Sequence, residues 1–230
     1  MPDDPIRYWQ NLTTTEVAAL AARDPVVILP LSAIEQHGPH LPLSTDLDIG
    51  IGLIAEAFGR LPSEMPARVL PPHTIGASRE HLKFPGTLSL DPELLTETIR
   101  QQGAALAACG ICRLVIFNTH GGNLQAINSA ALRLRDEFGL LVVKANYFTF
   151  SKPDDVELPE AEWRHGLHGG AVETAMMLHL HPGLVRTSAF KNFTSFGQEL
   201  EGTLLRLGPE GEAAFAWLAS DLNPHGVTGN

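Results

Sequence analysis

The sequence predicts an α/β fold, a three-layer α/β/α sandwich with a mostly parallel central sheet. Short apolar segments bounded by turn-forming residues alternate along the chain with longer segments of helical periodicity. The segment 113–118 (RLVIFN) is apolar without a break, which is typical of a strand buried on both faces. The chain has 230 residues, of which 44% are hydrophobic and 18% charged. This length and composition predict one globular domain over residues 1–230.

Helix caps and apolar runs locate the elements of the first half. The threonines of Thr13-Thr14-Thr15-Glu16 are cap candidates for a short helix, and Asp91 before Pro92 is a strong helix start. The run VVILPLS reads as a buried strand because β-branched and Leu residues fill it. In chain order we expect a helix over 13–22, a strand over 26–32, a helix over 46–58, a short apolar piece over 68–70 and a helix over 92–108.

The second half continues the alternation of strands and helices. Gly139 ends one helical pattern and Pro182 closely follows another. We expect a strand over 113–118, a helix ending at 138, a strand over 140–147, a helix over 171–180 and a helix around 211–218. Strands that alternate with helices favour parallel pairing, with helices on both faces of the sheet.

Charge and composition exclude several classes of protein. The formal net charge is −10 and no basic cluster occurs, so the sequence does not predict a nucleic-acid-binding surface. No apolar run has the length of a membrane span, and the N-terminus lacks the features of a secretory signal. We therefore expect a soluble cytoplasmic protein without a membrane partner.

The two cysteines, Cys109 and Cys112, form a CxxC motif that is compatible with a redox site. A reactive thiolate usually lies at a helix N-terminus, whereas this pair follows the end of a helix, where the dipole has the opposite sign. One CxxC cannot complete a four-cysteine zinc site. The pattern favours buried, reduced thiols in the core.

Ligand-type side chains gather where the first strand ends. Glu35, His37, His40 and Asp46 lie within twelve positions. Glu35 and His37 are two residues apart, so they point to the same side of an extended backbone. Asp46 stands at the start of a helical pattern. Two carboxylates and an imidazole at the end of a strand suit a divalent metal, although solvated loop residues that cap a helix would give the same pattern.

A second strand, 113–118, is followed by His120, Gly121, Gly122 and Asn123. The carboxyl ends of parallel strands form the usual site of an open sheet, so we expect His120 to reach the same edge. The two glycines allow a ligand to approach the backbone closely. Taken alone, His120 would be a hydrogen-bonded core residue.

Other polar residues in loops carry a weaker signal. His81, with Ser78 and Glu80, belongs to a loop-rich stretch, and polar loops are usually solvated, so His81 is not assigned to the site. Glu173 stands in the first turn of the helix over 171–180, where the dipole alone can account for a carboxylate. The segment 148–163 is irregular and acidic, which suits a lid or an oligomer contact.

Four motifs in order resemble the creatininase (creatinine amidohydrolase) family: SAIEQHGPHLPLSTD, EHLKFPGTLSL, NTHGGN and HGGAVET. The resemblance covers about residues 26–180. It implies a creatininase-like three-layer domain that assembles as a homo-oligomer, often a hexamer. It also implies two divalent metal ions (Zn, Mn or Fe) per subunit. In that pattern Glu35, His37, Asp46 and His120 are metal ligands, Asp46 bridges the ions, and His168 transfers protons.

Some positions depart from the pattern of enzymes that act on creatinine. Those enzymes carry Tyr and Glu after the central histidine, where this chain has Gly121 and Gly122, and Trp-Asp where it has Arg164 and His165. Relatives with HGGN include formamide hydrolases and the mycofactocin-system peptidase. Family members also commonly continue with one more helix beyond a segment like GVTGN, so that helix is missing from this sequence.

The missing metal-binding Glu must be replaced, because two dications need more anionic ligands than two carboxylates supply. Glu173 is the expected replacement, and its alternative is a buried carboxylate paired with a neighbour. Gly121, Gly122 and Asn123 are expected to bind substrate.

The expected function is a metal-dependent amidohydrolase acting on a non-peptide or cyclic C–N bond of a small-molecule amide. In that mechanism a metal-bound hydroxide attacks the carbonyl. Alternatives within the family are a peptidase of the mycofactocin type and a formamide hydrolase. A non-catalytic binding protein of the same fold is a further alternative. A Rossmann-type nucleotide enzyme is disfavoured because no G-x-G-x-x-G follows the first strand.

Overall fold

The structure is a computed structural model that describes residues 4–229. The chain divides into two compact units made of interleaved segments. The first contains the described residues up to Ala33, Gly50–Ala77 and Ser89–Phe150. The second contains Ile34–Ile49, Ser78–Leu88 and the described residues from Ser151 onward. The single domain inferred from the sequence stays a prediction.

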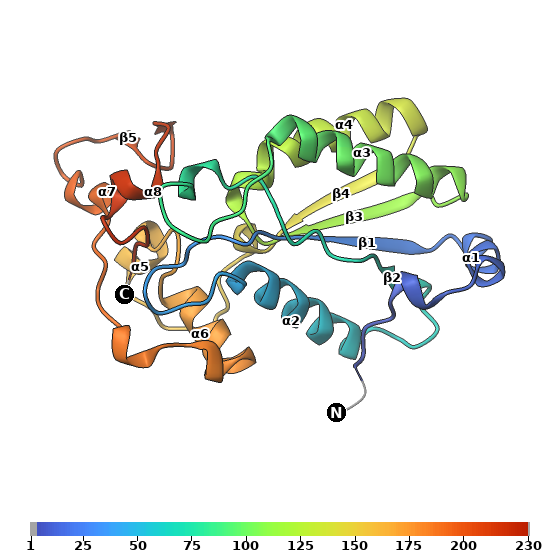
Figure 1. Cartoon of the computed structure of the whole chain (residues 1–230), viewed down its shortest axis with the longest axis horizontal. Coiled ribbons are helices and arrows are strands. Elements are labelled where there is room, and N and C mark those ends of the chain that lie inside the picture. The colour runs from blue at the N-terminus through green and yellow to red at the C-terminus, as the bar shows by residue number, and fades with distance from the viewer. Residues whose placement is uncertain (1–3, 230) are drawn as a thin grey trace. The chain divides into compact units, whose positions relative to one another are not determined.

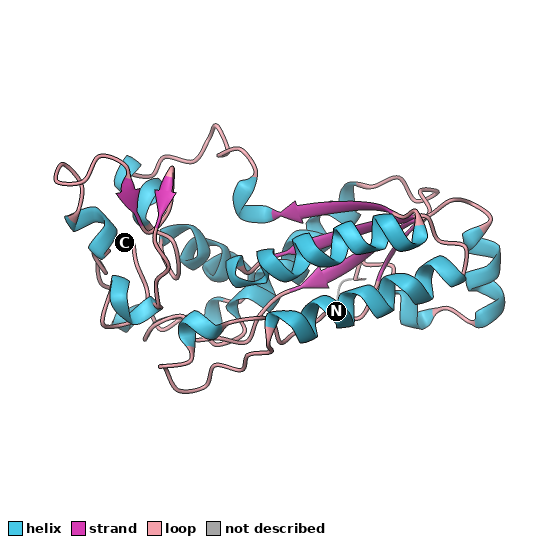
Figure 2. Cartoon of the chain, turned by 90° about the horizontal axis from the view of Figure 1, so that it is seen from above, coloured by secondary structure: helices cyan, strands magenta, loops and turns pink. Residues whose placement is uncertain are grey.

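A four-stranded parallel sheet forms the centre of the first unit, as predicted. Its order is β2-β1-β3-β4, and every neighbouring pair is parallel (Figures 1 and 2). The strands are β1 (Val26–Leu31), β2 (Ala67–Val69), β3 (Arg113–Asn118) and β4 (Leu141–Asn146). β1 pairs with β3 over its whole length, from Val26 opposite Arg113 to Leu31 opposite Asn118. Both strands therefore end at the same level.

Helices cover the two faces of this sheet. The helices are α1 (Thr14–Ala21), α2 (Thr45–Arg60), α3 (Pro92–Ala108) and α4 (Leu124–Phe138). On one face Leu29 and Leu31 of β1 join the core made with α3 and α4, while on the other face Ile28 packs against the cluster that contains Phe58 of α2. Alternate residues of a strand point to opposite faces, so the three predicted layers follow directly from the apolar run of β1.

Local signals placed the helix ends correctly. Thr13 and Glu16 form the capping box at the start of α1. Gly139 has φ +69° and ends α4 in the left-handed conformation. At Gly103 an added Cβ would lie 2.4 Å from Leu134, so the glycine allows α3 and α4 to approach each other closely.

The second unit contains short elements and long loops. Its regular elements are α5 (Glu160–His165), α6 (Ala171–Leu180), α7 (Phe196–Glu199), α8 (Ala219–Leu222), β5 (Leu207–Gly208) and β6 (Ala213–Ala214). The buried Glu162 accepts a hydrogen bond of 2.7 Å from the N–H of Ala171, so a carboxylate stabilises the N-terminus of α6. In residues 4–229 no helix combines the length and apolar character needed to span a membrane.

Two expectations were wrong. Residues 211–218 do not form a helix, because Gly211 has φ +108° and the segment instead provides β6 and the turn before α8. Cys109 and Cys112 are free, as predicted, but exposed. Cys109 is the C-cap of α3, and although Leu106 of the last turn is in the core, the cap residue itself faces outward.

Candidate metal centre

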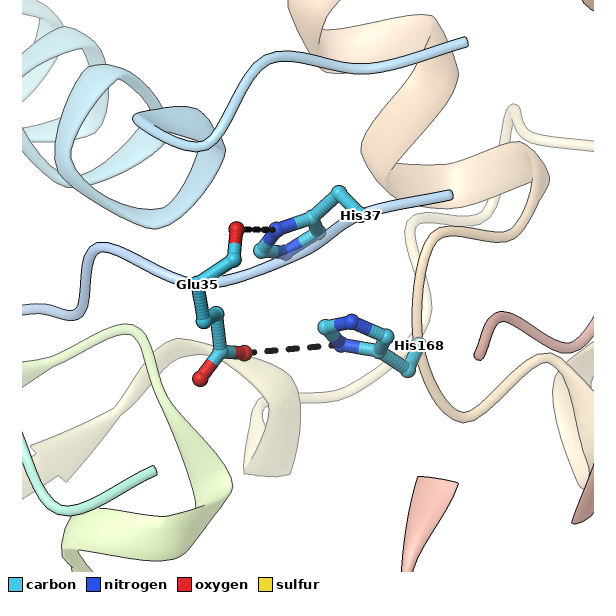
Figure 3. A group of neighbouring side chains, drawn as sticks. All are labelled: Glu35, His37 and His168. Carbon is cyan, nitrogen blue, oxygen red and sulfur yellow. Dashed lines mark hydrogen bonds and ion pairs between the residues drawn. The ribbon is translucent and has the colours of Figure 1, made fainter. Parts of the chain in front are cut away.

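The segment after β1 carries two buried ligand-type side chains on one side of the chain. Glu35 and His37 are both fully buried. The Nδ1–H of His37 donates to the backbone carbonyl of Glu35 at 3.2 Å (Figure 3). A histidine whose Nδ1 is held in this way presents its Nε2 as the ligand atom, which is the usual arrangement of a metal-binding imidazole.

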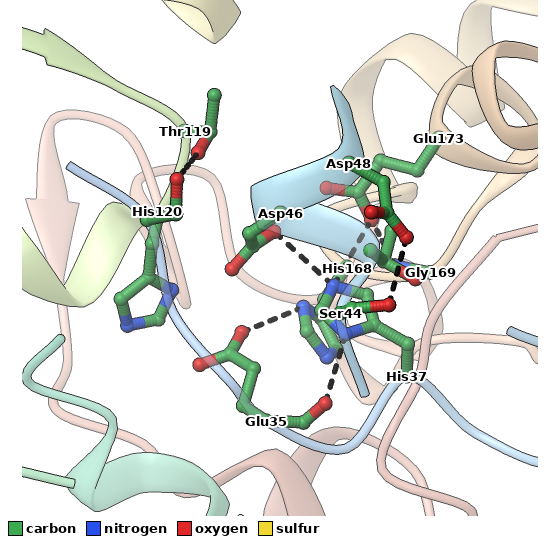
Figure 4. Close-up of polar contacts among 12 residues, drawn as sticks. Glu35, His37, Ser44, Asp46, Asp48, Thr119, His120, His168, Gly169 and Glu173 are labelled. Atoms are coloured by element: carbon green, nitrogen blue, oxygen red, sulfur yellow. Dashed lines mark hydrogen bonds and ion pairs between the residues drawn. The ribbon is translucent and has the colours of Figure 1, made fainter. Parts of the chain in front are cut away.

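Asp46 completes the first group of residues. It lies in the first turn of α2 and is 2% exposed, and its Oδ1 is 3.3 Å from Nε2 of His37 (Figure 4). The predicted helix start at this aspartate is confirmed. Burial disfavours the charged imidazole of His37, but the carboxylates of Asp46, Glu173 and Glu35 outweigh it and raise the pKa of His37 to about 9. A bound cation would take the place of this proton.

Glu173 faces the same histidine from the first turn of α6. Its Oε2 accepts a hydrogen bond of 2.7 Å from the N–H of Gly169 and lies 3.9 Å from Nε2 of His37. Donor atoms of His37, Asp46 and Glu173 lie within 4.8 Å of one another. These three residues can therefore hold one cation, which suits the expected replacement of the missing family carboxylate by Glu173.

His168 lies between two other imidazoles. Its ring centroid is 4.2 Å from those of His37 and His81. Its Nε2–H donates to the backbone carbonyl of Gln36 at 2.7 Å, and its Nδ1 lies 3.6 Å from Oε1 of Glu35 (Figure 3). Burial is the main cause that holds the pKa of His168 well below its usual value, and the neighbouring imidazoles of His37 and His81 disfavour a further charge there. His168 is therefore neutral, with the lone pair of Nδ1 directed toward Glu35.

The donor set fits a divalent metal. Within the second unit, one group combines Glu35, His37 and His168, and another combines His37, Asp46 and Glu173, each with its donor atoms within 4.8 Å. Buried carboxylates held this close repel one another unless a cation or a proton neutralises them. Carboxylate oxygen and imidazole nitrogen are ligands that suit Zn²⁺ and Mn²⁺.

The remaining predicted site residues belong to the first unit. His120 follows β3, is 4% exposed, and its Nε2 lies 3.0 Å from the carbonyl of Ala77. Because a carbonyl can only accept, the proton of a neutral His120 is on Nε2, so Nδ1 carries the lone pair. His120 as a metal ligand stays a prediction, as does the substrate-binding role of the turn Gly121–Asn123.

The amide of Asn123 is used within the fold. Its Oδ1 accepts from the N–H of Ala77 at 2.9 Å. Its Nδ2 donates to the carbonyl of Ser32 at 3.2 Å and to Oδ1 of Asn118 at 3.1 Å. The side chain ties together the ends of β1 and β3. An added Cβ at Gly121, by contrast, would have no heavy atom within 4 Å.

His81 is the residue of the second unit that sequence reasoning left out. It is 1% exposed and its Nε2 lies 3.5 Å from Oε1 of Glu35. A single histidine in a polar loop has no periodicity that would mark it as buried. The only available signal was its place in the motif EHLKFPGTLSL.

Comparison with known proteins shows which family this chain belongs to. The family profile of creatininase (creatinine amidohydrolase) matches residues 10–230. The mycofactocin precursor peptide peptidase of Mycolicibacterium smegmatis is 35% identical over 185 residues, covering 79% of this chain and 68% of that protein. The creatinine amidohydrolase of Pseudomonas putida is 33% identical over 190 residues, covering 73% of this chain and 69% of that protein.

Solved structures agree with the sequence relatives. A manganese form of creatininase superposes with a TM-score of 0.72 at 26% identity, covering 97% of this chain and 88% of that chain. A mutant creatininase described as Zn-Zn type gives the same TM-score and identity, covering 96% of this chain and 86% of that chain. The four-stranded parallel sheet with flanking helices, the buried His, Glu and Asp residues and the profile match lead to one conclusion. The chain belongs to the creatininase family of hydrolases.

Proposed function

We propose that this protein is a metal-dependent peptidase that hydrolyses an amide bond of a short peptide. The observation that carries the proposal is its 35% identity over 185 residues with the mycofactocin precursor peptide peptidase. The same reaction was an alternative in the sequence analysis, where a non-peptide or cyclic amide ranked first. Gly121 and Gly122 stand where the resemblance gives Tyr and Glu in enzymes that act on creatinine, and the smaller residues are compatible with a substrate larger than a small ring.

The residues of the second unit that would hold divalent ions are Glu35, His37, Asp46 and Glu173, while His120 as a further ligand stays a prediction from the family resemblance. Zn²⁺ and Mn²⁺ are the first ions to test, because solved relatives are described with them. Bound ions of this kind polarise an amide carbonyl and lower the pKa of a water molecule. The carboxylates of Glu35, Asp46 and Glu173 supply the negative charge that retains the ions in a buried site.

His168 has the geometry of a proton-transfer residue. Its Nε2–H is committed to the carbonyl of Gln36, which fixes the ring and leaves Nδ1 as the only nitrogen that takes up a proton. The lowered pKa keeps the ring neutral before the reaction and makes the protonated ring a ready acid. In the proposed reaction Nδ1 would take a proton from the attacking water and deliver it to the departing nitrogen, so that the hydroxyl group goes to the carbonyl carbon and the proton to the amine as the C–N bond breaks. The expected homo-oligomer and cytoplasmic location remain part of the proposal as predictions.

The substrate class can be tested with purified protein reconstituted with Mn²⁺ or Zn²⁺. We expect release of fragments from members of a short-peptide panel, detected by mass spectrometry, and little or no hydrolysis of creatinine. N-formyl compounds and lactams complete the panel, because related enzymes include a deformylase at 25% identity. Efficient hydrolysis of creatinine without cleavage of any peptide would overturn the proposal.

A further inference from the structure

His81 is a buried histidine whose side chain lies against the candidate metal centre. It ends a short 3-10 helix (Arg79–His81) and is 1% exposed. Its Nε2 lies 3.5 Å from Oε1 of Glu35 and 3.9 Å from Oε1 of Glu80. Its ring lies 4.2 Å from that of His168, centroid to centroid. His81 therefore touches both a candidate ligand and the candidate proton-transfer residue.

The amide of Gln36 determines which nitrogen of His81 carries the proton. Nε2 of Gln36 lies 2.5 Å from the carbonyl oxygen of Gly226, and Oε1 of Gln36 lies 3.0 Å from the N–H of Gly38. A carbonyl only accepts and an N–H only donates, so these two contacts fix the orientation of the amide. The second N–H of Gln36 then donates to Nδ1 of His81 at 2.8 Å. A neutral His81 must carry its proton on Nε2, the atom nearest to Glu35.

Gly226 shows that this arrangement is built into the fold. Its φ is +76°, and an added Cβ would lie 2.7 Å from both amide atoms of Gln36 and from the ring of Phe84. Only glycine lets the carbonyl of residue 226 approach the amide of Gln36 without displacing it. The segment around Gly226 thus holds Gln36, and Gln36 holds the tautomer of His81.

We propose that His81 is a positioning residue that orients the carboxylate of Glu35 for metal binding through its Nε2–H. This inference rests on the proposed function and extends it to a residue behind the ligands. A donor on one side of a ligating carboxylate restricts its rotation and directs its remaining lone pairs toward the ion. The face of the same imidazole limits the tilt of His168, so one side chain orients two members of the site.

Two substitutions of His81 distinguish the roles of its two ring nitrogens. His81→Gln keeps a donor near the position of Nε2, whereas His81→Asn keeps only a group near Nδ1 that can pair with Gln36. We expect His81→Asn to weaken Mn²⁺ binding by about 10–100-fold, the usual effect of losing a partner of a metal ligand. We expect His81→Gln to bind Mn²⁺ almost as tightly as the parent protein does. His179→Asn, at an exposed position of α6, is the control and should bind Mn²⁺ like the parent protein.

A second readout does not depend on activity or on metal. Nitrogen-15 NMR of the metal-free protein, recorded where the imidazoles are neutral, should show the Nε2–H tautomer for His81. An Nδ1–H tautomer, or a His81→Asn protein that binds Mn²⁺ as tightly as the parent, would overturn the inference. If His81→Asn does not fold, the tautomer of His81 in the parent protein still tests the inference. A parent protein that binds Mn²⁺ but cleaves no peptide would refute the proposed function and leave the His81 comparison intact.

Discussion

Glu173→Gln is expected to lower the metal content from two ions per chain toward one and to reduce peptide turnover by about a thousandfold or more. A loss of turnover of this size is typical when one preorganised electrostatic group is removed from an active site. Glu173 lies 3.9 Å from Nε2 of His37 and forms one three-residue group with His37 and Asp46. A neutral amide of the same shape keeps the packing but removes the charge that retains the second ion.

The measurement for Glu173→Gln is metal content after equilibrium dialysis, compared with turnover on the same sample. Glu199→Gln is the matched control, because Glu199 is exposed on α7 in the same unit. The control should keep both the metal and the activity. A Glu173→Gln protein that retains two ions and turns over normally would show that this carboxylate only holds the turn at Gly169.

His168→Gln should reduce kcat by about 10²–10⁴-fold while leaving the metal content unchanged, as expected for loss of a general acid. The amide nitrogen of glutamine can still donate to the carbonyl of Gln36, as Nε2 does now at 2.7 Å. The substitution therefore removes Nδ1 and little else. The ring of His168 also packs between two imidazoles, so a thermal unfolding measurement must accompany the kinetics.

Two other outcomes are informative for His168→Gln. Activity within about twofold of the parent would exclude proton transfer at Nδ1, because general acid–base catalysis contributes far more than that. A loss of metal with the loss of activity would instead assign Nδ1 to the group formed with Glu35 and His37. His179→Asn again serves as the control for loss of an imidazole elsewhere on the chain.

Much of the fold could be predicted because its signals are local. β1 and β3 are short apolar runs, threonines stand at the start of α1, and Gly139 ends α4 in a left-handed conformation. Alternation of these elements was enough to predict a parallel sheet. The prediction of a helix over 211–218 was wrong, because Gly211 adopts a backbone conformation that a helix cannot contain.

The candidate site was predictable only in part. Glu35, His37 and Asp46 are near one another in sequence, so their spacing indicated a shared site. His81 meets Glu35 across 46 residues, and Gln36 reaches Gly226 across 190 residues. Such contacts depend on how the loops of the second unit pack, which no local pattern records. The prediction that Cys109 and Cys112 are buried was wrong for a related reason. The residue at the end of a helix can face solvent even where the helix packs on the core.

We propose above all that this chain binds two divalent ions and uses them to hydrolyse a peptide bond. The most direct test of this proposal is to strip the protein with a chelator, titrate it with Mn²⁺ and follow bound metal and peptide cleavage in the same samples. We expect cleavage to be absent without metal and to reach its maximum as occupancy approaches two ions per chain. Full cleavage by the stripped protein, or no retained ion at saturating Mn²⁺ and Zn²⁺, would contradict it.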